Sequence, residues 1–117
     1  MGIFYIQTKA PYGDTQARDG IDALLAAAAF EQVAGVLFKG DGVWQLLQHQ
    51  SADAIGLKSL EKMLKALPMY GVEKIFVCQE TLKRLNLSLD QLIVQPTVLS
   101  AEEQGQLINQ QSCVLSF

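Results

Sequence analysis

The stretch that decides how this chain is interpreted reads KIFVCQETLKRL, residues 74–85. Its apolar run ends at Cys78, and residues 79–85 follow at once with the spacing of a helix. A strand that passes directly into a helix is typical of α/β proteins. In open parallel sheets, ligands bind at the carboxyl ends of the strands. The sequence therefore predicts that Cys78 lies at the edge of the sheet where proteins of this class bind ligands and carry out reactions.

Four further strands are predicted, and they alternate with helical segments. The predicted strands span residues 3–7, 34–38, a broken strand over 92–94 and 96–99, and 113–117, and the predicted helices span residues 16–30, 43–47, 57–67 and 100–110. This alternation predicts one domain over residues 1–117, an α/β, three-layer flavodoxin-like fold with a mostly parallel five-stranded sheet.

The composition is more apolar than expected for a domain of this size. With Gly counted and Tyr left out, about 55% of the 117 residues are apolar, against roughly 45 to 50% in soluble domains. The helix over residues 16–30 contains four consecutive alanines and is expected to be buried on more than one face. We therefore expect a buried subunit interface, with Tyr12, Ala26, Ala27 and Trp44 as its candidate residues.

Charge and the metal-binding residue types exclude several classes of function. The net charge is -3 and the pI is near 5.0, so the chain lacks the positive charge that direct nucleic-acid binding needs. Two Cys without close spacing and one His predict no metal site and no cofactor, and they favour the cytoplasm. The apolar stretch over residues 23–30 is far too short to span a membrane.

Two interpretations of Cys78 remain open from the residues alone. A helix N-terminus favours a thiolate, whereas the nearby carboxylate of Glu80 opposes it and Lys83 and Arg84 lie more than a turn away. The other interpretation is a small buried side chain that ends a strand. Cys113 has apolar neighbours and is expected to be structural. No catalytic residue is assigned, and Cys78 is the one candidate sulfur acceptor.

Three segments carry a resemblance to a known family. They are KAPYG at residues 9–13, ARDGIDALLA at residues 17–26 and DGVWQLL at residues 41–47. In these segments, and over nearly its whole length, the chain resembles the TusC/DsrF branch of the DsrE/DsrF-like sulfur-relay family. The chain departs from that family where Leu85-Asn86 replaces a common Arg-Gly, although Asn also adopts the left-handed cap of a helix end.

The resemblance implies a DsrE-like fold and a role in a hetero-hexamer. It implies TusB-like and TusD-like partner subunits in a TusBCD complex, an indirect link to TusA, TusE and tRNA, and transfer of persulfide sulfur toward 2-thiouridine at the tRNA wobble position. In such complexes the TusD-like subunit carries the essential cysteine, and DsrF relatives can lack one at the position of Cys78. The implied role is therefore a non-catalytic subunit.

Three alternatives stay open. A DsrF-like subunit of a DsrEFH complex would serve sulfur oxidation, and neighbouring genes would distinguish it. A sulfurtransferase would use Cys78 itself. A flavodoxin-like module would bind a small ligand alone, but the chain has no Gly-rich phosphate motif to support that function.

Overall fold

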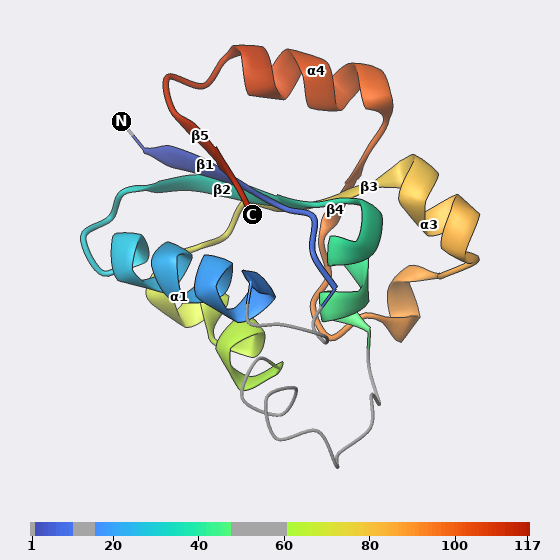
Figure 1. The fold of residues 1–117 in the computed structure, drawn as a ribbon, viewed down its shortest axis with the longest axis horizontal. Coiled ribbons are helices and arrows are strands. Elements are labelled where there is room, and N and C mark those ends of the chain that lie inside the picture. The colour runs from blue at the N-terminus through green and yellow to red at the C-terminus, as the bar shows by residue number, and fades with distance from the viewer. Residues whose placement is uncertain (1, 11–15, 48–60) are drawn as a thin grey trace.

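The computed structural model describes residues 2–10, 16–47 and 61–117. One sheet of five parallel strands, in the order β4-β3-β2-β1-β5, forms its centre (Figure 1). The strands are β1 (Ile3–Gln7), β2 (Val33–Phe38), β3 (Ile75–Cys78), β4 (Thr97–Leu99) and β5 (Val114–Ser116). The predicted α/β fold with a five-stranded sheet is confirmed, and its strands are all parallel.

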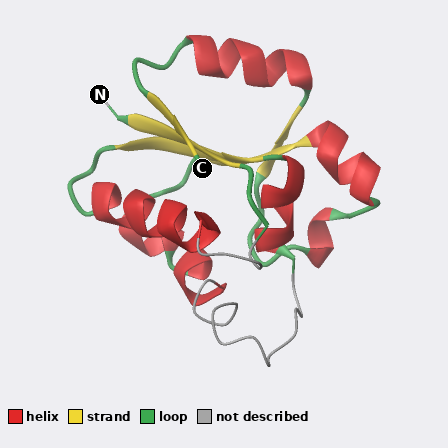
Figure 2. Cartoon of the chain, viewed as in Figure 1, coloured by secondary structure: helices red, strands yellow, loops and turns green. Residues whose placement is uncertain are grey.

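Helices lie on both faces of the sheet, as Figure 2 shows. One face is covered by α1 (Gln16–Ala28) together with the 3-10 helices η1 (Gly40–Leu46) and η2 (Leu67–Tyr70). The other face carries α4 (Ala101–Asn109). Right-handed crossovers explain this division, because β1 to β4 advance in one direction and the return from β4 to β5 runs the opposite way.

The order of the strands differs from that of flavodoxin itself, which is 2-1-3-4-5. Here the chain adds β2, β3 and β4 in sequence on one side of β1, and β5 returns to the other side. The carboxyl ends of all five strands still share one edge, because every pairing is parallel. Both Cys78 and the loop that follows β2 lie on this edge, as predicted.

The main core lies between the sheet and α1. Side chains alternate along each strand, so Tyr5, Val36 and Val77 point to the α1 face, where Ile21 and Leu24 meet them. Each of these side chains is at most 2% exposed. Burying a side chain of this size stabilises the fold by about 1.5 to 3 kcal/mol.

The first helix buries one face within the isolated chain. Ile21, Leu24 and Ala28 are buried at a spacing of three and four residues, whereas Ala26 is exposed. Within the isolated chain the helix therefore buries one face, and its burial on a second face, against another subunit, stays a prediction. Of the four alanines, Ala26 and Ala29 are exposed, whereas Ala27 is partly buried and Ala28 is buried.

Two predicted elements also differ in type or extent. The segment at residues 43–47 was expected as a helix that follows a turn, but the 3-10 helix η1 already begins at Gly40. The predicted strand at residues 92–94 is absent from the described structure, because Leu92 makes only an isolated antiparallel bridge to Leu47. The second half of that broken strand is β4, an edge strand as Pro96 indicated.

The helix ends follow from local residue chemistry. Of the helix predicted over residues 57–67, residues 57–60 lie outside the described residues, and the described part is helical over 61–65 and ends before Pro68. The short helix α3 (Gln79–Leu85) ends at Asn86 with φ 55° and ψ 45°, the left-handed cap predicted for it. The predicted capping box of α4 is confirmed, with Ser100 accepting from the backbone N–H of Glu103.

Candidate functional site

Cys78 ends β3 and directly precedes α3. Its backbone is extended, with φ -74° and ψ 121°, and its side chain is 6% exposed. In the sheet it pairs with Leu99 of β4, so it lies on the face covered by α4. The sulfur is therefore held at the carboxyl edge of the sheet beneath the first turn of α3 and the start of α4.

Two buried polar side chains lie beside this cysteine. Thr81 of α3 accepts a hydrogen bond of 3.1 Å from the backbone N–H of Gly40 through its Oγ1. Gln104 of α4 donates from Nε2 to the carbonyl of Leu99 at 3.0 Å. Each is 5% exposed. Each keeps one further donor, because a hydroxyl both accepts and donates and an amide nitrogen carries two hydrogens.

These donors lower the pKa of the Cys78 thiol. Burial raises this pKa, but hydrogen bonding from the Thr81 hydroxyl and the Gln104 amide, and from the backbone N–H groups of Thr81 and Glu80, outweighs it. The Cys78 sulfur makes no full capping hydrogen bond to the first turn of α3, so the lowering of its pKa comes from several weaker contacts. The mixed environment predicted from the sequence is in fact one that favours the thiolate.

A cavity of about 470 Å³ opens beside Cys78. Its lining comes from the ends of β2 and β3, from α3 and from the first turn of α4. It consists of Lys39, Gly40, Cys78, Glu80, Thr81, Arg84, Ala101 and Gln104. Lys39 and Arg84 bring two positive charges to this space. Cys78 lines this cavity although it is largely buried, and the two cations beside it, partly offset by the Glu80 carboxylate, suit reaction with an anionic or polarised sulfur compound.

Sequence reasoning missed most of this lining. Arg84 was expected to lie too far from Cys78 to lower its pKa, because more than one turn of helix separates them in the sequence, yet both residues line the same cavity. Lys39 follows β2, and its position at the end of a predicted parallel strand could have indicated it. Gln104 carried no signal, because only the return of α4 over the sheet brings it to Cys78.

Close packing explains two residues of the DGVWQLL segment, Gly42 and Gln45. A Cβ on Gly42 would lie 2.0 Å from the backbone oxygen of Gln7, so η1 packs directly on the end of β1. Gln45 is 2% exposed and donates from Nε2 to the carbonyl of Lys9 at 2.8 Å. This segment therefore joins the loop after β1 to the loop after β2 at the edge that carries Cys78.

The predicted interface residues fall in different environments. Tyr12 lies outside the described residues. Ala26 is exposed on α1, and Ala27 is partly buried against the core. Trp44 is partly buried in η1. Their role as interface residues stays a prediction.

Cys113 was expected to be a structural residue within a strand over residues 113–117. It is exposed and directly precedes β5, where its carbonyl accepts a hydrogen bond of 2.9 Å from the N–H of Phe4. The cysteine is therefore held by its backbone, while its thiol faces solvent.

No group of three or more His, Cys, Asp or Glu in residues 2–10, 16–47 and 61–117 is arranged to hold a metal ion. Within the same part of the chain, no helix has the length and apolar character needed to cross a membrane.

The fold and site together define an α/β protein with a parallel sheet and a cysteine cavity at its carboxyl edge. Residues 1–117 match the DsrE/DsrF-like family. A protein of Vibrio parahaemolyticus named Protein TusC homolog is 39% identical over 115 residues, which are 98% of each chain. A protein of the same name from Vibrio vulnificus is 34% identical over 115 residues, again 98% of each chain. This chain belongs to the DsrE/DsrF-like family, as its sequence segments predicted.

Solved structures agree on the fold. The crystal structure of the ychN protein from E. coli matches 99% of this chain and 98% of its own, with a TM-score of 0.82 and 20% identity. A protein of unknown function from Methanobacterium thermoautotrophicum matches 98% of this chain and 96% of its own, with a TM-score of 0.63 and 15% identity. At these identities the similarity concerns the fold.

Proposed function

We propose that this chain is a non-catalytic subunit of a TusBCD-type sulfur-relay complex, which passes persulfide sulfur toward 2-thiouridine at the tRNA wobble position. Its partners in this proposal are TusB-like and TusD-like subunits in a cytoplasmic hetero-hexamer, with TusA, TusE and tRNA reached through them. Membership of the DsrE/DsrF-like family and the two relatives named Protein TusC homolog support the assignment.

The structural observation that carries this proposal is an apolar surface away from the Cys78 cavity. Phe30, which follows α1, is 76% exposed, and Met69 and Tyr70 of η2 are 88% and 52% exposed. A hollow of about 310 Å³, lined in part by Ala28 and Tyr70, connects the end of α1 with η2. Large exposed apolar side chains that gather in this way mark protein interaction surfaces.

Co-expression tests the proposal. The chain is expressed with the TusB-like and TusD-like proteins of the same genome, and the purified material is examined by size-exclusion chromatography with light scattering. We expect one complex that contains all three chains. If this chain elutes as a monomer while the other two associate with each other, the proposal fails.

The geometry around Cys78 also favours a second candidate function, a sulfurtransferase that uses Cys78 itself. The lowered pKa of its thiol and the cations Lys39 and Arg84 in the adjoining cavity support this function. In the reaction, the Cys78 thiolate attacks the terminal sulfur of a donor persulfide. The donor S–S bond breaks, the donor leaves as a thiolate, and Cys78 becomes a persulfide.

Mass spectrometry distinguishes the two functions. After incubation with a persulfide donor, a mass increase of about 32 Da on the peptide that contains Cys78 would support the second function. Cys113 is the internal control, because it is exposed and lies outside the Cys78 cavity. If the TusD-like partner gains the sulfur and Cys78 does not, the second function is excluded and the first is retained.

A further inference from the structure

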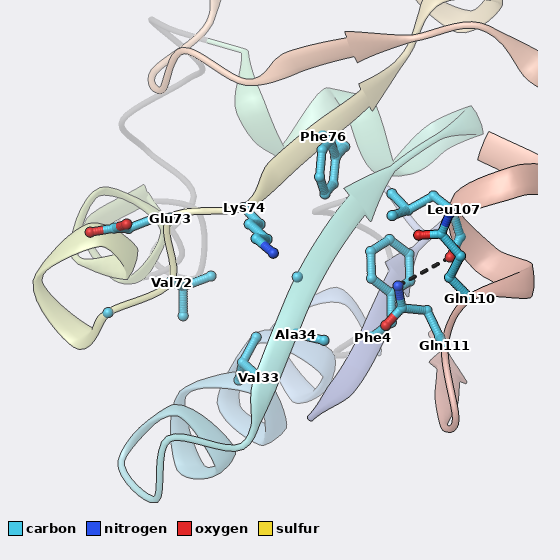
Figure 3. A pocket seen from close by; sticks show the side chains of 12 residues that line it. Phe4, Val33, Ala34, Val72, Glu73, Lys74, Phe76, Leu107, Gln110 and Gln111 are labelled. Atoms are coloured by element: carbon cyan, nitrogen blue, oxygen red, sulfur yellow. Dashed lines mark hydrogen bonds between the residues drawn. The ribbon is translucent and has the colours of Figure 1, made fainter. Parts of the chain in front are cut away.

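A second cavity lies on the face of the sheet that α4 covers, and it adjoins the hollow at the end of α1, with which it shares Val33, Gly71 and Val72. Its volume is about 330 Å³, and β1, β2, β3 and the last turn of α4 surround it. The lining that Figure 3 draws includes the side chains Phe4, Lys74, Phe76, Leu107, Gln110 and Gln111. Pockets of roughly 300 to 1,000 Å³ are the usual size for small ligands.

The floor of this cavity is built by an irregularity in β2. Ile3 pairs with Val33 and Phe4 pairs with Gly35, so Ala34 is the extra residue of a β-bulge. A Cβ on Gly35 would lie 3.1 Å from Cε1 of Phe4, so glycine allows the Phe4 ring to lie low against the strand. The space above β2 therefore stays open where a β-branched residue would fill it.

Two aromatic rings border this open space. The centroids of Phe4 and Phe76 are 6.2 Å apart and the rings are tilted by 39°. Phe4 is 1% exposed, whereas Phe76 is partly exposed. The Phe4 ring therefore forms part of the floor of the cavity, and the Phe76 ring offers a surface on which a planar molecule can stack.

One positively charged side chain at the rim, that of Lys74, points into the cavity. Figure 3 shows the Lys74 side chain extending over the cavity from the start of β3, while Glu73 extends to the other side. Among the described residues, Lys74 forms no ion pair. Gln111 is occupied by a bond from Nε2 to the Leu107 carbonyl at 3.1 Å, and the exposed amide of Gln110 is available beside it.

We propose that this cavity is a binding site for a small planar aromatic anion, whose ring stacks on Phe76 and whose anionic group meets the Lys74 amine. The bulge at Ala34, the glycine beside Phe4, and a cation and an aromatic ring that line the same cavity together provide both shape and charge for such a ligand. This site is separate from the Cys78 cavity and does not depend on the proposed function.

Binding of 2-naphthoate and of its neutral counterpart 2-naphthamide to the purified full chain tests the proposal. Protein amide resonances are followed by NMR as each compound is added. We expect the largest shifts at Gly35 and Phe76 and a Kd for 2-naphthoate of about 1 mM, as for other ligands of this size. Binding of 2-naphthamide should be at least about threefold weaker, because it lacks the charge.

Two substitutions separate the contributions of ring and charge. Phe76→Leu keeps an apolar side chain and should weaken both compounds, whereas Lys74→Gln should weaken 2-naphthoate and leave 2-naphthamide unchanged. Lys62→Gln, which removes an exposed lysine outside the cavity, is the matched control and should have no effect. The proposal is wrong if neither compound shifts these resonances at about 10 mM, far above the expected Kd, if Lys74→Gln binds 2-naphthoate unchanged, or if the largest shifts occur at Lys39 and Cys78.

Discussion

The backbone N–H of Gly40 and the Oγ1 of Thr81 form a hydrogen bond of 3.1 Å across 41 residues of sequence. This bond joins the loop after β2 to the first turn of α3, directly beside Cys78. Because Thr81 accepts from Gly40, its own hydroxyl hydrogen is free to serve the Cys78 sulfur. One buried side chain therefore fixes the shape of the cavity and favours the thiolate within it.

Thr81→Val should raise the pKa of Cys78 and lower stability. The substitution keeps the shape of the side chain but removes the hydroxyl, which leaves the Gly40 N–H without its acceptor. We expect the free energy of unfolding to fall by about 1 to 3 kcal/mol. In a Cys113→Ser background, the ultraviolet absorbance of the Cys78 thiolate as a function of pH measures the shift in its pKa.

Thr97→Val is the matched control for this experiment. Thr97 is exposed on β4, so its substitution should leave both the Cys78 pKa and the stability nearly unchanged. An equal pKa in the Thr81→Val variant and the control would contradict the role given to the Thr81 hydroxyl.

The pH dependence of stability should contain a contribution from Cys78. Burial raises the pKa of this thiol, but hydrogen bonding outweighs it, so the folded-state pKa lies below the ordinary value of 9.0. A group of this kind stabilises the fold above the unfolded pKa and loses that contribution as the pH falls through the folded pKa. The free energy of unfolding of the native chain, relative to Cys78→Ser, should therefore rise as the pH increases toward 9.0.

Urea titrations of the two proteins at a series of pH values measure this difference. Tyr5 does not confuse the result, because burial and the nearby charge of Cys113 raise its pKa above 10.0. Its contribution is fully present below that pH and is common to both proteins. A difference that stays constant from neutral pH to 9 would show that folding leaves the Cys78 pKa unshifted.

Gly42→Ala should be strongly destabilising, whereas Gly105→Ala should be stabilising. The new Cβ at position 42 would lie 2.0 Å from the Gln7 carbonyl oxygen, and a backbone atom cannot move aside cheaply. We expect the free energy of unfolding to fall by about 3 kcal/mol or more.

Gly105 is the contrasting position. No atom lies within 4 Å of a Cβ at position 105, inside α4, so alanine there should raise the free energy of unfolding by about 0.5 to 1 kcal/mol. Thermal unfolding of both variants compares the two positions, and similar melting temperatures would refute the packing of η1 on β1.

Much of this fold is predictable because its strongest signals are local. The apolar runs that end at Gln7, Phe38 and Cys78 became strands close to their predicted limits. The capping residues at Ser100 and Asn86 also behaved as their side-chain chemistry predicts. Residues 92–94 were misjudged because a short apolar run fits a strand or a buried turn equally well, and only tertiary contacts decide between them.

The candidate site was less predictable, because its residues meet through the topology. Cys78 was found from its position between a strand and a helix. Thr81 and Gln104 are common residue types with no periodic signal, and they matter only because α3 and α4 bring them to the same sulfur. The strand order that places α4 on this face depends on the return of β5 beside β1, which no local pattern contains.

Substitution of the exposed apolar residues should separate association from folding. Phe30 and Met69 bury little of their surface in this chain, so Phe30→Ser and Met69→Ser should change its unfolding free energy by less than about 0.5 kcal/mol. In the proposed complex the same side chains are covered by sister subunits, and removal of large apolar anchors weakens such interfaces by about 2 kcal/mol or more, roughly thirtyfold in Kd. Leu89→Ser is the control, because Leu89 is 37% exposed on the 3-10 helix η3 (Leu89–Gln91), away from the end of α1. The measurement is the amount of TusB-like and TusD-like protein that co-purifies with each variant. Equal recovery with all three variants would place the interface on another surface, whereas loss with Phe30→Ser and Met69→Ser alone would assign it to the end of α1 and η2.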